Sequence, residues 1–185
     1  MAEASPVTPA PGELEFVRAF VNTLDIEAGT DVLADAEEWR VWAAGQSLEA
    51  SADAAQLSEA RELREALRAA LIANHDRAPL PPETIAALDR AADRARPAVR
   101  FTPDGARLAP PERGMPAVYG RIVASVASAL QDGSWSRLKA CASDACRWGF
   151  YDTSRSRTGQ WCAMAICGNR AKQARWRQQA ATPAR

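Results

Sequence analysis

The sequence predicts an α+β fold, with a mainly helical N-terminal domain that contains one small β-hairpin and a short C-terminal metal-binding module. Three observations predict it. Apolar residues recur at helical spacing over residues 13–133. The period shortens to two at one place near residue 100, beside a turn signal. The four cysteines all lie after residue 134. We therefore divide the chain into a flexible leader (1–12), a helical domain (13–133) and a cysteine-containing module (134–185).

Four helices are expected before the hairpin. In the first, apolar residues repeat on one face from Phe16 to Leu24. Thr30 or Asp31 has the side chain to cap the second helix. The positions predicted to face the core in the second, third and fourth helices are Val32, Ala36, Trp39 and Ala43, then Leu57, Ala60, Leu63, Leu67 and Leu71, then Ile85, Leu88, Ala92 and Ala95.

The hairpin follows the fourth helix. Val99 and Phe101 alternate with Arg100, and Pro103-Asp104-Gly105 is a turn signal before a returning strand that contains Leu108. A fifth helix completes the domain, and its apolar face consists of Val118, Ile122, Val126 and Leu130.

The formal charge of the 185-residue chain is zero, but it is unevenly distributed. Residues 137–185 hold ten Lys and Arg against two Asp, which makes this segment +8 and leaves residues 1–136 at −8. A basic segment of this density favours a polyanionic partner. The sequence therefore predicts contact between the C-terminal segment and nucleic acid, or between that segment and an acidic protein surface.

The cysteines are expected to be reduced thiols. The first fifteen residues have neither a basic start nor an apolar core, so they do not resemble a signal peptide, and no stretch is apolar enough to span a membrane. Both observations favour a cytoplasmic protein without membrane contact, and the cytoplasm keeps thiols reduced. A disulfide framework is therefore the weaker interpretation of the four cysteines.

The cysteines form two pairs, Cys141 with Cys146 and Cys162 with Cys167, and each pair has four residues between its members. Two such pairs separated by a loop can place four thiolates at the corners of a tetrahedron, which is the geometry of structural zinc. About fifty residues bury too little apolar surface to fold securely alone, so a metal would supply the missing stability. Four thiolates fill the coordination shell, and we therefore predict one structural Zn²⁺ without catalytic activity. Iron is the rival metal.

Several short runs around the cysteines resemble one family. Phe150-Tyr151-Asp152 follows the first pair, Trp161 precedes Cys162, and Cys167-Gly168-Asn169-Arg170 contains the last ligand. Over residues 135–180 these runs resemble the CGNR-type zinc finger. In that family an N-terminal ABATE domain precedes the finger, and the segment from Phe16 to Asp25 resembles the opening motif of that domain.

The resemblance implies a bacterial protein of two domains, with a treble-clef finger whose last ligand is carried by a helix. It also implies a stress-linked transcription regulator whose N-terminal domain binds an unidentified small ligand. Asn22, Thr23 and Arg40 are polar residues set among apolar ones, and they are our candidates for ligand binding. The alternative is that they cap helices or satisfy hydrogen bonds within the core. A homodimer is expected, because one short finger has limited contact with DNA.

Six cations of the finger are predicted to contact nucleic acid. Two lie in the polar loop between the cysteine pairs and four on a helix expected over residues 168–179, where long cationic side chains can replace the counterions of a phosphate backbone. The alternative is that they offset the negative charge of a zinc ion bound by four thiolates, and Asn169 and Arg170 in particular can serve the metal site. Trp161 is expected in the small core around the zinc rather than stacked on bases. The six cations are Arg155, Arg157, Arg170, Lys172, Arg175 and Arg177.

The function predicted from these features is that of a transcription regulator that binds DNA through the zinc finger. The alternative is a zinc-stabilised adaptor for protein–protein contact that does not bind nucleic acid. RNA stays open as a partner, because charge alone does not distinguish it from DNA. The sequence contains no evident nucleophile–base pair, phosphate-binding loop or open metal site, so no enzymatic activity is expected.

Overall fold

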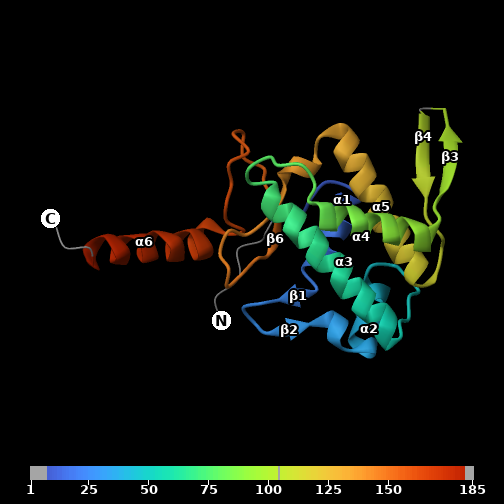
Figure 1. The fold of residues 1–185 in the computed structure, drawn as a ribbon, viewed down its shortest axis with the longest axis horizontal. Helices are drawn as coiled ribbons and strands as arrows, with labels where there is room; N and C mark the ends of the chain where they lie inside the picture. The colour runs from blue at the N-terminus through green and yellow to red at the C-terminus, as the bar shows by residue number, and fades with distance from the viewer. Residues whose placement is uncertain (1–7, 104, 182–185) are drawn as a thin grey trace.

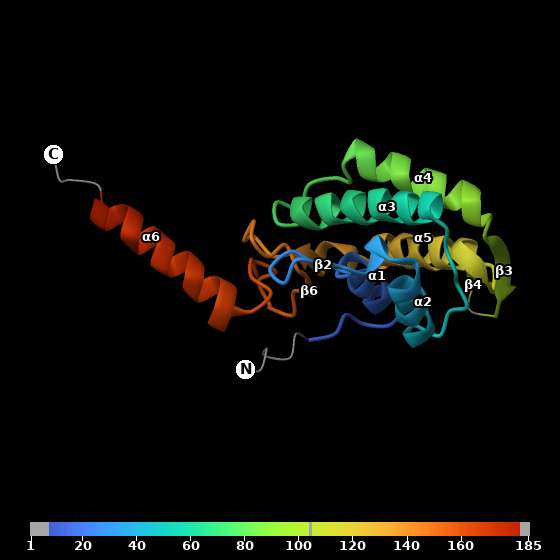
Figure 2. The same ribbon diagram turned by 90° about the horizontal axis from the view of Figure 1, so that it is seen from below.

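The computed structural model describes residues 8–103 and 105–181, with side chains as far as residue 178. In these ranges the body is a bundle formed by α1 (Leu14–Val21), α3 (Ala54–Ala73), α4 (Pro82–Ala95) and α5 (Gly114–Asp132). α3 and α4 lie side by side, and both lie above α5 and α1 in Figure 2. Residues 1–7 of the predicted leader fall outside the described residues, but Ala10 is buried against the core.

The core lies between α1 and the three longer helices. The apolar face of α1 is buried from Phe16 to Val21, as predicted, but the helix ends before Leu24, which is half-buried in a short strand. Phe16 and Phe20 of α1 contact the tryptophans of α2 (Ala36–Gly45). The rings of Trp39 and Trp42 stack with their centroids 5.1 Å apart. Other large side chains that are buried at predicted core positions are Leu67, Leu71, Ile122 and Val126.

The second helix begins later than predicted. The expected cap residues instead form β2 (Thr30–Asp31), which pairs antiparallel with β1 (Leu24–Asp25) and is followed by a 3-10 turn, η1 (Val32–Ala34). Asp31 caps this turn, and Asp35 caps α2, because its carboxylate accepts two backbone N–H groups of the first turn at 2.8 and 3.0 Å. Apolar periodicity alone does not separate a 3-10 turn from the helix that follows it.

The prediction for the buried face of α4 was wrong at Ile85, whose exposed fraction is 47%. The face that packs on α3 and α5 is the neighbouring one, which begins at Thr84, and its small side chains allow the helices to approach closely. The Thr84 hydroxyl donates to the carbonyl of Ala66 on α3 at 2.6 Å, so this polar side chain is satisfied in the core. The other buried residues of α4 are Ala87, Ala91 and Ala95.

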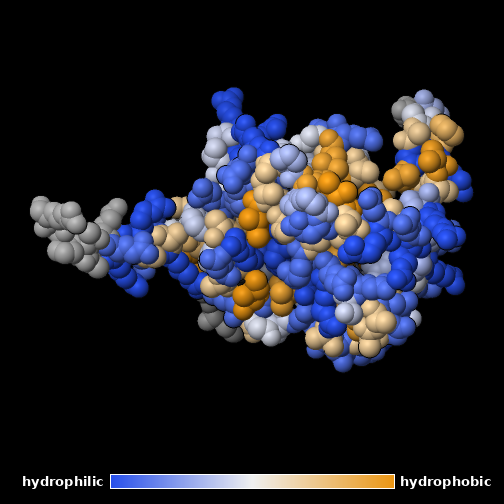
Figure 3. Space-filling model, in the orientation of Figure 1, coloured by the Kyte–Doolittle hydropathy of each residue, from blue (hydrophilic) through white to orange (hydrophobic). Residues whose placement is uncertain are grey.

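The predicted hairpin is confirmed as β3 (Ala98–Thr102) paired antiparallel with β4 (Gly105–Ala109). It projects from one end of the body (Figure 1), and hydrophobic atoms are visible on its surface in Figure 3. Phe101 is 86% exposed and Val99 is 53% exposed. The apolar alternation therefore predicted the strands, but the structure leaves much of their apolar face uncovered.

A third antiparallel pair connects the helical body with the cysteines. A turn, η2 (Trp135–Arg137), leads into β5 (Leu138–Ala140), which pairs with β6 (Gly149–Tyr151) so that Lys139 lies opposite Phe150. Trp135 and the apolar residues of β5 belong to the same buried cluster as the helical body. The first half of the finger is therefore packed into the N-terminal core.

The last helix leaves the body. A single π-helical turn, η3 (Met164–Gly168), leads into α6 (Asn169–Ala181), which projects away from the bundle at the end opposite β3–β4 (Figure 1). Within residues 8–103 and 105–181, no helix has both the length and the apolar run needed to cross a lipid bilayer.

Candidate metal centre and its basic helix

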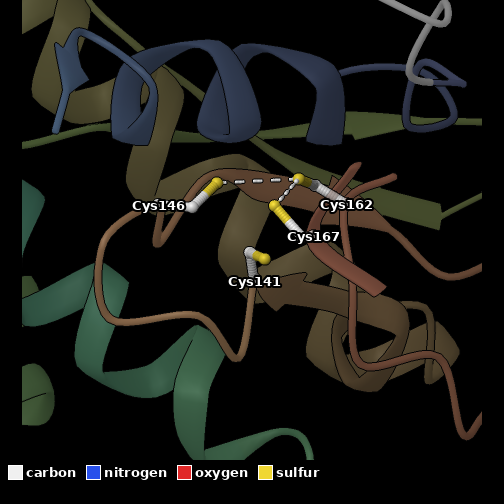
Figure 4. Close-up of side chains that lie close together, drawn as sticks. All are labelled: Cys141, Cys146, Cys162 and Cys167. Carbon is white, nitrogen blue, oxygen red and sulfur yellow. Dashed lines mark hydrogen bonds between the residues drawn. The ribbon is translucent and has the colours of Figure 1, made fainter. Parts of the chain in front are cut away.

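The four cysteines converge at one point (Figure 4). Cys141 directly follows β5, Cys146 precedes β6, Cys162 lies in the loop after β6, and Cys167 lies in η3. The Sγ atom of Cys162 lies 3.6 Å from that of Cys146 and 3.8 Å from that of Cys167. All four sulfurs lie within 4.8 Å of one another. A tetrahedral zinc with bonds of about 2.3 Å places its sulfurs about 3.8 Å apart. The arrangement therefore fits zinc, as predicted.

The ionisation of the thiols also fits a divalent metal. The thiols of Cys146 and Cys162 interact with Cys141 and lower the pKa of its thiol, and the same interactions raise the pKa of Cys146 and of Cys162. Burial, together with the charge on Cys141, raises the pKa of Cys167 to about 12. Four thiolates are therefore stable together only when a cation offsets their charge, and zinc supplies that charge when it binds.

The first pair of ligands lies in a tight turn, here called the zinc knuckle (residues 141–149). The N–H of Cys141 donates to the carbonyl of Trp148 at 2.8 Å, and the N–H groups of Cys146 and Arg147 both donate to the carbonyl of Ser143 at 2.9 Å. Arg147 has a φ of 52°, which is unusual for a residue with a side chain. This conformation turns the chain from Cys146 into β6.

Side chains of the finger pack closely around Gly168, which follows the last ligand, Cys167. A Cβ atom at this position would overlap the Sδ atom of Met164 and would lie 3.2 Å from the Cδ1 atom of Trp161. The space that a Cβ would occupy is thus filled by side chains of the finger, and the lack of a side chain at Gly168 permits this close packing. Trp161 is half-buried against the cysteine cluster, as expected, and so are Trp148 and Ile166.

A buried ion pair beside the metal centre was not predicted. Lys139 of β5 is 1% exposed, and its ammonium donates to the Asp152 carboxylate at 2.9 Å and to the carbonyls of Arg157 and Gly159 at 2.7 and 3.3 Å. Burial raises the pKa of Asp152, but hydrogen bonds from Ser154 and Lys139 outweigh it and hold the pKa at about 2. The sequence shows both residues only as charges, and the strand pairing places them together.

The structure separates the six predicted cations into two groups. Arg170 forms an ion pair with Glu27 of the β1–β2 turn at 2.8 Å. The neighbouring Asn169 donates to the carbonyl of Ala165 at 3.0 Å, so this amide makes a local helical contact. The five others are exposed, and no ion pair joins any of them to another described residue; they are Arg155, Arg157, Lys172, Arg175 and Arg177.

The exposed side of α6 combines charge with an aromatic ring. Lys172, Arg175 and Trp176 are spaced by three and four residues, so they share one face of the helix. Trp176 is 71% exposed and therefore does not belong to the small core around the cysteines. The helix is polar on its other faces also, so it buries little surface of its own.

The three candidate ligand-binding residues do not lie around one space. The amide of Asn22 is bonded to Gly149 of the finger, and the hydroxyl of the buried Thr23 donates to the carbonyl of Phe20 at 2.8 Å. Arg40 is exposed and pairs with Glu37 on the same helix. Ligand binding by these residues stays a prediction.

Two buried arginines of α3 were also missed by sequence reasoning. Arg64 is 3% exposed and forms an ion pair with Asp31 of β2, and Arg68 reaches backbone carbonyls of α1 and of the zinc knuckle. Both lie on the helix face predicted from Leu63, Leu67 and Leu71 to be buried, and this position is the only signal that the sequence holds.

The chain matches two family models. Residues 15–146 match ABATE, which carries the description "Putative stress-induced transcription regulator", and residues 137–180 match the CGNR zinc finger. The two matches overlap over residues 137–146, which contain β5 and the first pair of metal ligands. No curated protein matches the sequence. The resemblance that the cysteine runs and the N-terminal motif predicted is thus confirmed for both parts of the chain.

Proposed function

Because the chain belongs to the ABATE family and carries a CGNR zinc finger, we propose that it regulates transcription by binding DNA through this finger. The zinc is structural, since four thiolates leave no coordination position for a substrate, and the proposal is therefore one of binding rather than of catalysis.

One observation carries this proposal: the cations of α6 other than Arg170 are exposed and have no ion-pair partner among the described residues. Unpaired cations that lie close together repel one another, and a polyanion relieves the repulsion by replacing its own counterions with them. The buried pair of Lys139 with Asp152 takes no part, because its charge is already balanced.

The shape of α6 also supports binding to a duplex. The helix has 13 residues and is thus about 20 Å long, and it projects from the body without a covering element (Figure 1). A major groove about 12 Å wide admits one α-helix. In this arrangement Lys172 and Arg175 would face the groove, and the loop that contains Arg155 and Arg157 would contact phosphates.

The test is fluorescence anisotropy of the zinc-loaded protein with a labelled duplex at several salt concentrations. The test variant is Lys172→Ala with Arg175→Ala. The matched control is Arg100→Ala with Arg107→Ala, which removes two exposed cations that face each other on β3–β4 at the opposite end of the molecule. We expect the test variant to bind more weakly and to lower the log–log salt slope by about two, while the control keeps the wild-type slope.

The outcomes separate the proposal from its alternatives. Equal losses in the two variants would mean that binding depends only on net charge and not on α6. Tighter binding to RNA than to the duplex, measured in parallel, would make RNA the partner. No binding at low salt would contradict the proposal and favour an adaptor, in which the finger contacts acidic protein surfaces as Arg170 contacts Glu27 within this chain.

We further propose that the helical body senses a small ligand. A groove of about 400 Å³ between α3 and α4 supports this, and it does not include the three residues predicted from the sequence. Arg94 pairs with Glu59 across it at 2.6 Å, and Tyr119 also lines it, so a ligand with both positive and negative groups would be favoured. The test is a screen of polar metabolites for a rise in Tm that Arg94→Ala abolishes. A rise that persists in this variant would place the ligand elsewhere.

A further inference from the structure

The helical domain binds the backbone at both flanks of the first cysteine pair, at the end of β5 and within the zinc knuckle. The Nε2–H group of His75 donates to the carbonyl of Ala140, the residue before Cys141, at 2.6 Å. Nη1 of Arg68 donates to the carbonyl of Arg147, the residue after Cys146, at 2.8 Å. Both side chains come from the C-terminal half of α3 and the turn that follows it. The two backbone positions next to the metal ligands are thus held from outside the finger.

The contact at Arg147 lies at a strained point of the backbone. Arg147 is left-handed with a φ of 52°, and such a conformation costs a residue with a side chain about 1 kcal/mol or more. Its own guanidinium pairs with Asp144 inside the knuckle. Arg68 donates to the carbonyl of Arg147 and thereby offsets part of the cost of this backbone conformation. The side chain of Arg68 is 5% exposed, and it also donates to the carbonyl of Val21 at the end of α1 at 2.7 Å. The guanidinium therefore joins the knuckle to the core of the body.

A third contact continues this pattern into β6. The amide of Asn22, which follows α1, donates from Nδ2 to the carbonyl of Gly149 at 3.0 Å and accepts the N–H of the same residue at Oδ1 at 2.6 Å. One side chain thus satisfies both backbone groups of Gly149, as a neighbouring strand would. A Cβ at Gly149 would lie 3.1 Å from this Oδ1, so the glycine permits the close approach.

We propose that Arg68 and His75 are positioning residues for the zinc site, and that the helical domain thereby sets the zinc affinity of the finger. The apolar contacts of the knuckle are those of the small cluster around the cysteines, and the shape of the knuckle decides where the sulfurs of Cys141 and Cys146 lie. Groups that orient metal ligands typically contribute ten- to a hundredfold to metal affinity. The proposal does not depend on DNA binding, since it concerns only the metal and the fold.

The coupling acts in both directions. If the contacts of α3 raise zinc affinity by a given factor, bound zinc stabilises the conformation of α3 that makes those contacts by the same factor. A change in the helical domain, such as ligand binding, would therefore reach the finger through the residues next to its ligands.

Arg64 offers a matched control for the test. It lies one turn before Arg68 on α3, is equally buried and also pairs with Glu65, but its other partners are Asp31 and Thr23 of the helical domain. None of its hydrogen bonds among the described residues reaches the finger. Arg64→Met and Arg68→Met therefore remove a buried arginine from one helix, and only the second also removes a knuckle contact.

The experiment measures zinc affinity of the full-length protein by competition with a chromogenic chelator. We expect Arg68→Met to bind zinc at least tenfold more weakly and Arg64→Met to stay within about threefold of wild type. Absorption of the Co²⁺-loaded proteins at saturating metal is the second readout. Arg68→Met should alter the visible bands of the tetrahedral thiolate site, which a loss of stability elsewhere would leave unchanged.

Several results would overturn the proposal. Equal zinc affinity in Arg68→Met and wild type would do so, and so would equal losses in the two arginine variants, or a wild-type Co²⁺ spectrum in Arg68→Met. Circular dichroism establishes that each variant is folded. If Arg68→Met does not fold, His75→Ala takes its place, since His75 lies in the turn after α3 and is only half-buried. Unchanged affinity in His75→Ala would then refute the proposal.

Discussion

Replacement of Lys139 by Met should destabilise the protein more than any exposed substitution in the finger. The change keeps the length and apolar part of the side chain but removes an ammonium that is 1% exposed. Three acceptors lose their donor at once: the Asp152 carboxylate and the carbonyls of Arg157 and Gly159. The Asp152 carboxylate is then left buried without a counterion.

The expected cost follows from these contacts. Breaking a buried ion pair by removal of one partner costs about 3–5 kcal/mol, because the remaining charge is uncompensated. This is a large part of the roughly 5–15 kcal/mol by which a domain is stable. Lys139→Met combined with Asp152→Asn removes the stranded charge and should recover part of the loss, since the two sites are coupled.

The assay is urea unfolding of the zinc-loaded protein, followed by tryptophan fluorescence and circular dichroism. Lys172→Met is the matched control, because Lys172 is exposed on α6, and it should change the free energy of unfolding by less than about 0.5 kcal/mol. A loss below about 1 kcal/mol in Lys139→Met, or a double variant less stable than Lys139→Met, would refute the reasoning.

Four other predictions concern acid, space, metal and exposure. The pKa of Asp152 falls from 3.8 to about 2 on folding, so this carboxylate should contribute roughly 2 kcal/mol to the free energy of unfolding above pH 4 and lose that contribution as the pH falls through 2. Acid unfolding of Asp152→Asn should lack this component, and the same pH dependence of stability in wild type and variant would contradict the prediction. Gly159→Ala should cost about 1–3 kcal/mol in urea unfolding, because its Cβ would lie 2.8 Å from the carboxylate of Asp152, and an unchanged midpoint would show that the loop yields. Removal of zinc with a chelator should lower the Tm of the helical bundle as well as of the finger, because β5 is packed in the common core; a bundle Tm that is independent of zinc would mean that the two fold separately. Phe101→Ser should leave the free energy of unfolding within about 0.5 kcal/mol, because Phe101 is 86% exposed, and a larger loss would reveal a contact that this exposure does not account for.

Much of the fold was predictable because it is encoded locally. The apolar faces of α1, α3 and α5 repeat at helical spacing, and burial follows from that spacing except at Leu130 near the end of α5, which was predicted to be buried but is 45% exposed. The errors occurred where local patterns are ambiguous. At Ile85 the larger side chain indicated the wrong face of α4, since the tight contact between helices selects small residues instead.

The sequence by itself determined the metal centre. The two cysteine pairs and the runs around them predicted the zinc site and the family, because a metal imposes ligand type and spacing that few other constraints produce. It also determined the uneven charge and the helix that carries four of the six cations predicted to contact nucleic acid.

Only the tertiary structure decided which charges are free and what supports the metal. Lys139 and Arg170 count equally as cations in the sequence, yet one is buried against Asp152 and the other pairs with Glu27. Arg68 lies 78 residues before Cys146 in the numbering, and it reaches the knuckle because β5 packs against α3. Such contacts join residues that no local pattern relates, since they depend on how the helices and strands pack together in space.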